Sequence, residues 1–114
     1  MRYELTRLNI FLPKKPATLL ALYQLTMQLY KDFGGCTHSI THPPVFIGYW
    51  LEPLKPAPAR EEIVWFIVDV DQRLDDPRLE YFSHLKKSLE EKTGEGEVWI
   101  TCHPVWRFIS PSRL

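Results

Sequence analysis

The stretch "IVWFIVDV", Ile63–Val70, decides the fold, because Asp69 is its only polar residue. Successive side chains of a strand point to opposite faces of a sheet, so both faces of this strand are apolar. Both faces must therefore be covered, which is typical of a strand in the middle of its sheet. We expect a central strand at 63–70.

The segments before this strand predict two further strands and a helix. Apolar residues alternate from Tyr3 to Leu12, and aromatic and β-branched residues fill 45–51, which indicates two strands. Apolar residues at helical spacing predict an amphipathic helix over 16–33, closed by Gly34. The residues assigned to its buried face are Leu19, Leu22, Tyr23, Leu29, Tyr30 and Phe33.

The segments after the central strand predict a second helix and a fourth strand. Asp76 and Pro77 provide an N-cap and a first helical position, and apolar residues at helical spacing continue from Leu79 to Leu89. Residues 98–109 have a strand composition, but Pro104 removes a backbone donor from the ladder. We therefore expect Pro104 at an edge or a bulge, and the predicted topology places the fourth strand at an edge of the sheet.

The order strand, helix, strand, strand, helix, strand predicts a ferredoxin-like α+β fold, βαββαβ. This fold has a four-stranded antiparallel sheet in the order fourth, first, third, second, with two helices on one face. A chain of 114 residues is long enough for a single domain, which we expect to span 1–114.

Composition excludes several classes of partner and location. Fourteen Lys and Arg balance fourteen Asp and Glu, and basic residues do not cluster as nucleic-acid binding requires. The first residues, "MRYELTRLNIFLP", are not a secretory signal, and no apolar run approaches the length of a membrane span. We expect a cytoplasmic protein that binds neither nucleic acid nor membrane, with its two cysteines as reduced thiols.

The central strand also predicts an assembly. Two helices shield one face of the sheet and leave the other face to water in a monomer. Each large side chain left exposed there forfeits roughly 1.5 to 3 kcal/mol of burial. Because large apolar patches mark partner surfaces, we expect a homodimer formed through the sheet, or a ligand pocket beneath it.

Five Cys and His side chains are candidate metal ligands: Cys36, His38, His42, Cys102 and His103. Their spacing is not a zinc signature, and the predicted fold places the second and fourth strands at opposite edges of the sheet. We therefore expect no metal or other cofactor within one subunit. A site shared between subunits stays open as an alternative.

The segment from Cys36 to Trp50 is the best candidate for a ligand pocket. We expect Cys36, His38, Tyr49 and Trp50 to line it, because Cys36 and His38 share a face in extended chain and the aromatic rings can stack on a flat ligand. The predicted function is a homodimeric small-ligand-binding module. The alternatives are a small enzyme of the dimeric α+β barrel type, using His38 or Cys36 in proton transfer, and a protein–protein interaction module.

Three motifs carry a family resemblance: "FGGCTHS" at 33–39, "GYW" at 48–50, and the acidic residues that open "EEIVWFIVDV" at 61–70. Together they resemble small uncharacterised bacterial and phage proteins with a Gly-Gly-x-Thr, Gly-aromatic-Trp and downstream Glu pattern. The resemblance covers residues 33–70. It implies a compact α+β fold, and no activity can be inferred from it.

Overall fold

The computed structural model describes residues 1–40, 46–50, 54, 56–57 and 59–111. In this part of the chain, two α-helices accompany five antiparallel strands, which confirms the α+β prediction. The elements are β1 (Arg2–Pro13), α1 (Leu19–Phe33), β2 (Thr37–His38), β3 (Phe46–Trp50), β4 (Ala59–Val70), α2 (Glu80–Thr93) and β5 (Trp99–Phe108). A short 3-10 turn precedes each α-helix, at Pro16–Thr18 and Pro77–Leu79.

The sheet has the order β2-β4-β1-β5, and β3 also pairs with β4. Strand β4 therefore lies inside the sheet, between β1 on one side and the short strands β2 and β3 on the other, as the apolar composition of 63–70 predicts. Strand β5 pairs with β1 and carries Pro104 opposite Thr6. The placement of the last strand at an edge is confirmed.

The predicted count of four strands is wrong, because two separate strands pair with the outer side of β4. This strand is 12 residues long, and its two ends have different partners. Thr37 of β2 lies opposite Ile67, whereas Phe46 of β3 lies opposite Ile63. Between these two ladders, Ser39 forms hydrogen bonds with both backbone polar groups of Trp65. The Ser39 N–H donates to the Trp65 carbonyl at 3.1 Å, and the Ser39 hydroxyl accepts from the Trp65 N–H at 3.0 Å.

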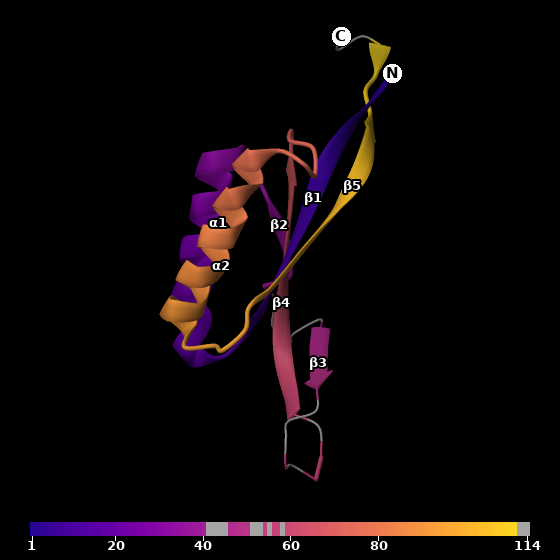
Figure 1. Ribbon diagram of the computed structural model, residues 1–114. Coiled ribbons are helices and arrows are strands. Elements are labelled where there is room, and N and C mark those ends of the chain that lie inside the picture. The colour runs from indigo at the N-terminus through magenta and orange to yellow at the C-terminus, as the bar shows by residue number, and fades with distance from the viewer. Residues whose placement is uncertain (41–45, 51–53, 55, 58, 112–114) are drawn as a thin grey trace.

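Both helices cover the same face of the sheet (Figure 1). Alternate residues of β4 point into the core beneath them, and Val64 and Phe66 are completely buried there. The other core side chains come from β1, α1, β4, α2 and the residue just before β5: Leu8, Ile10, Leu12, Leu22, Leu25, Leu29, Val68, Val70, Phe82, Leu85, Leu89 and Val98. Gly34 ends α1 in the left-handed conformation, with φ of 83°, as the sequence predicts.

The predicted buried face of α1 is partly wrong. The structure buries Leu22, Leu25 and Leu29, while Tyr23 and Tyr30 are exposed to solvent. The difference arises because α1 carries apolar residues on two opposite sides, and helical spacing alone does not separate one side from the other. Helix α2 has apolar residues on its buried side and charged residues outside.

The sheet extends past the helix layer at both ends (Figure 1). Strands β1 and β5 continue together beyond one end, and β3 continues with the start of β4 beyond the other. This gives the molecule extents of 55 × 31 × 24 Å. No helix in the described part of the chain is long and apolar enough to cross a membrane.

Candidate functional site

The face of the sheet away from the helices, here called the open face, carries a group of aromatic side chains. Phe11 of β1 and Trp65 of β4 lie opposite each other, and their rings are stacked with centroids 5.8 Å apart and planes at 24°. Phe46 of β3 contacts Trp65 edge-on at 5.4 Å. We call Phe11, Phe46 and Trp65 the aromatic platform.

A buried amide fixes the central ring of the platform. Asn9 is only 6% exposed, and its Oδ1 accepts a hydrogen bond from the Trp65 indole Nε1 at 3.0 Å. The Nδ2 of Asn9 lies 3.4 Å from Thr101 Oγ1 and 3.4 Å from His103 Nδ1, both on β5. Every polar atom of this amide is therefore engaged, which holds Trp65 in one orientation over β1.

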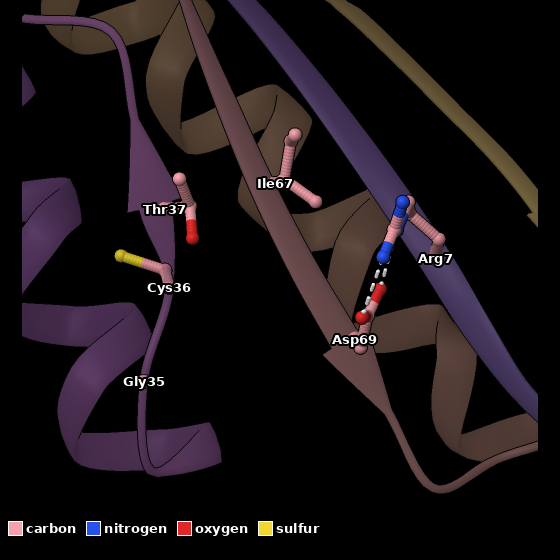
Figure 2. A pocket seen from close by; sticks show the side chains of 6 residues that line it. All are labelled: Arg7, Gly35, Cys36, Thr37, Ile67 and Asp69. Atoms are coloured by element: carbon pink, nitrogen blue, oxygen red, sulfur yellow. Dashed lines mark hydrogen bonds and ion pairs between the residues drawn. The ribbon is translucent and has the colours of Figure 1, made fainter. Parts of the chain in front are cut away.

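Beside the platform, an ion pair borders a shallow hollow of about 290 Å³ at the outer side of β4 (Figure 2). The Arg7 guanidinium binds Asp69 through two hydrogen bonds, Nε to Oδ1 at 2.8 Å and a terminal nitrogen to Oδ2 at 3.0 Å. The hollow is lined by Arg7, Gly35, Cys36, Thr37, Ile67 and Asp69.

This pair makes the hollow polar without giving it a net charge. The hydrogen bonds to Asp69 raise the pKa of Arg7 and keep the guanidinium charged. A guanidinium has five N–H donors, so three remain free of Asp69, and each Asp69 oxygen keeps a lone pair for another donor. The hollow therefore presents donors and acceptors side by side.

Of the four predicted pocket residues, Cys36 alone lines this hollow, and its thiol turns away from it. Figure 2 shows the Cys36 side chain pointing away from the Arg7–Asp69 pair. Its Sγ lies 4.0 Å from the Thr26 carbonyl oxygen of α1, and the side chain packs against the hydrophobic core. Burial raises the pKa of the Cys36 thiol, which disfavours the thiolate that a nucleophile needs.

His38 shares the helix side of the sheet with Cys36. Its ring packs edge-on against buried Phe66 at 5.5 Å, and its Nδ1 accepts a hydrogen bond from the Ile40 N–H at 3.2 Å. The structure thus places Cys36 and His38 on one face, while the thiol and the imidazole have different contacts.

Tyr49 and Trp50 lie far from Cys36 and His38. On β4, the residue opposite His38 is Phe66, whereas the residue opposite Tyr49 is Arg60. At about 3.3 Å per residue, these positions are roughly 20 Å apart. Tyr49 is exposed to solvent, and the Trp50 side chain lies outside the described residues. The structure therefore does not gather the four predicted residues around one point.

The candidate metal ligands are also dispersed. Cys36 and His38 lie at β2, while Cys102 and His103 lie on β5, opposite Leu8 and Arg7, with β4 and β1 in between. His42 is outside the described residues. Among the residues that are described, no three His, Cys, Asp or Glu side chains come together to hold a metal ion.

Sequence reasoning did not predict two contacts on the open face, the one between Asn9 and Trp65 and the one between Arg7 and Asp69. Asn9 interrupts an alternating apolar strand, and Arg7 and Asp69 are charged residues on the two central strands. A buried polar residue in a strand pattern is a usable signal, but its partners depend on the register between strands that are far apart in the sequence.

Comparisons of this chain with protein-family models, with curated proteins and with solved structures found no match.

Proposed function

We propose that this protein is a homodimeric small-ligand-binding module that pairs through the open face of its sheet. The observation that carries the proposal is the aromatic platform, with Ile63 and Ile67 beside it. Phe46 is exposed, and the other four side chains are only partly buried by their neighbours on the sheet. A contiguous surface of large, fixed apolar side chains is typical of an interface.

The size of the open face supports a second copy of the chain as the partner. Four strands about 4.8 Å apart, over the eight residue pairs of the β1–β4 ladder at about 3.3 Å each, give a flat area of roughly 500 Å². Side chains corrugate this surface and raise its area toward the roughly 800 Å² that each partner buries in a standard interface. The open face also holds both members of the Arg7–Asp69 pair, so two copies meet without an excess of like charge.

The fold also suits such a dimer if its plan is ferredoxin-like. We infer that β2 and β3 are two pieces of one interrupted outer strand, because both pair antiparallel with the same side of β4. Counted in this way, the sheet has four strands in the order last, first, third, second. Two sheets of this plan stacked through their open faces make a dimeric α+β barrel.

The hollow beside Arg7 and Asp69 is the proposed ligand site. It lies on the open face, so the sheet of a second copy would cover it and shield a bound molecule from water. Its free donors and acceptors suit a small polar molecule that carries both kinds of group, such as an amide or a zwitterion. The raised pKa of Cys36 disfavours the enzyme alternative that uses this thiol.

Sedimentation analysis tests the dimer. Ile67→Lys places a charge in the centre of the open face and should halve the average mass of the wild-type assembly, whereas Ser83→Lys on the exposed side of α2 should not change it. Native mass spectrometry tests the ligand: a bound small molecule should be present in the wild type and lost in Arg7→Met. A wild-type protein that is strictly monomeric and carries nothing rejects the proposal.

A further inference from the structure

The outer side of α1 carries a second line of large apolar side chains, away from the sheet. Leu20, Tyr23, Met27 and Tyr30 are 71%, 56%, 66% and 63% exposed. Their spacing of three, four and three residues places them on one stripe of the helix, the pattern of a helix–helix seam. We call these four residues the α1 ridge.

An ordinary surface helix buries one apolar stripe and exposes a polar one. Helix α2 follows this rule, since Ser83, His84 and Lys87 occupy its exposed side. Helix α1 buries Leu22, Leu25 and Leu29 and still presents the ridge on its opposite side. A helix that is apolar on both sides is expected to be covered on both sides.

We propose that the α1 ridge is a second self-association surface, on which α1 of another copy lies antiparallel. With a twofold axis level with Leu25, position 20 meets position 30 and position 23 meets position 27. Each tyrosine of one copy then lies against Leu20 or Met27 of the other. The surface is self-complementary, as a twofold contact requires, and it pairs a thioether with an aromatic ring.

The shape of the ridge agrees with this pairing. A hollow of about 590 Å³ lies along the C-terminal half of α1, lined by Met27, Gln28, Tyr30, Lys31 and Asp32. Leu20, the most exposed residue of the ridge, is at the N-terminal half. In the antiparallel arrangement, Leu20 of each copy faces this hollow of the other, as a knob faces a hole.

The area and the charge also favour a second copy. A large side chain has an area of roughly 150 to 250 Å², and 56% to 71% of each ridge side chain is exposed, so the ridge offers on the order of 500 Å² per copy. Two copies then bury on the order of 1,000 Å², which suits a specific but weak and reversible interface. The flanks carry Gln24, Gln28 and Asp32 with a single cation, Lys31, whereas a helix that lies on a lipid surface is rich in Lys and Arg.

The ridge does not depend on the dimer proposed above. Helix α1 covers the face of the sheet opposite the open face, so the two surfaces point in different directions (Figure 1). A chain with two different twofold contacts assembles beyond a dimer, into a closed tetramer or a longer array. The two contacts can therefore be removed one at a time.

Sedimentation of the full chain in the Ile67→Lys background isolates the ridge. This protein should form a concentration-dependent dimer, and adding Met27→Glu should raise its dissociation constant at least about a hundredfold, tenfold for each carboxylate that the twofold axis introduces. Ser83→Glu adds the same charge to α2 and should leave the dissociation constant unchanged. An unchanged dimer in the Met27→Glu protein, or a monomer before that change, overturns the proposal.

Disulfide cross-linking in a chain that keeps Ile67 tests whether the two α1 helices run antiparallel. In a Cys36→Ser, Cys102→Ser chain, Leu20→Cys and Tyr30→Cys proteins should form a disulfide with each other when mixed and oxidised. Leu20→Cys alone should not cross-link, since the two copies of position 20 would be about 15 Å apart at 1.5 Å per residue. Cross-linking of Leu20→Cys with itself at the mixed rate contradicts the antiparallel contact, and so does the absence of any cross-link in the mixture.

Discussion

The indole of Trp65 donates a hydrogen bond to the buried amide oxygen of Asn9 across the ladder between β4 and β1. This bond connects the central strand β4 to Asn9, a polar side chain that is buried next to the platform. It explains how a large ring can lie on the open face of the sheet in a single orientation, with Phe11 and Phe46 packed around it.

Replacing Asn9 should therefore destabilise the protein through Trp65. Asn9→Leu leaves the indole N–H without a protein acceptor in a partly buried position, which should lower the free energy of unfolding by about 1 to 3 kcal/mol. Urea unfolding followed by circular dichroism measures this change. The double variant with Trp65→Phe should recover part of the loss, because both polar partners are then gone. Additive effects of the two changes would contradict the coupling.

The two cysteines should differ in reactivity. Burial raises the pKa of the Cys36 thiol, whereas Cys102 is exposed on β5. Because the thiolate is the reactive form, a thiol reagent at neutral pH should modify Cys102 several times faster than Cys36. Cys102→Ser should remove the fast phase of the reaction and Cys36→Ser the slow one. Equal rates at the two thiols would show that Cys36 is not shielded in this way.

Stability at high pH should depend on Tyr81. Partial burial, together with its hydrogen bond to Asp32, raises the pKa of this hydroxyl to about 12. An unfolded tyrosine ionises near pH 10, so the folded state holds a proton that the unfolded state loses between these values. The contribution of Tyr81 to stability is complete below about pH 10 and falls as the pH rises toward 12. Urea unfolding from pH 9 to 12 should show a shallower fall for Tyr81→Phe than for the wild type.

The central strand and the helices follow from local patterns in the sequence. An apolar run such as Ile63–Val70 needs cover on both sides wherever it lies, so its interior position could be predicted without knowing its neighbours. Gly34 could likewise be placed, because the left-handed conformation at the end of α1 favours glycine. Neither prediction needed a long-range contact.

The candidate site depends on register and could not be predicted in the same way. Cys36, His38, Tyr49 and Trp50 are close in the sequence, but two separate ladders place them far apart along β4. Arg7 and Asp69 are 62 residues apart in the chain and lie directly opposite each other. The exposure of the second apolar side of α1 could not be predicted for a similar reason. Periodicity shows how apolar residues are spaced along a helix, but it does not show which side packs against the rest of the protein.

The interruption opposite Trp65 has a consequence for the behaviour of the protein at high concentration. An unbroken outer strand is a template on which foreign chains stack into fibrils. Here Ser39 forms hydrogen bonds with the backbone of β4 between two short ladders. At the opposite edge, Pro104 of β5 has no backbone N–H to donate. Both edges of the sheet are thereby poor seeds for amyloid-like growth, although the sheet has a strand order that leaves two edges.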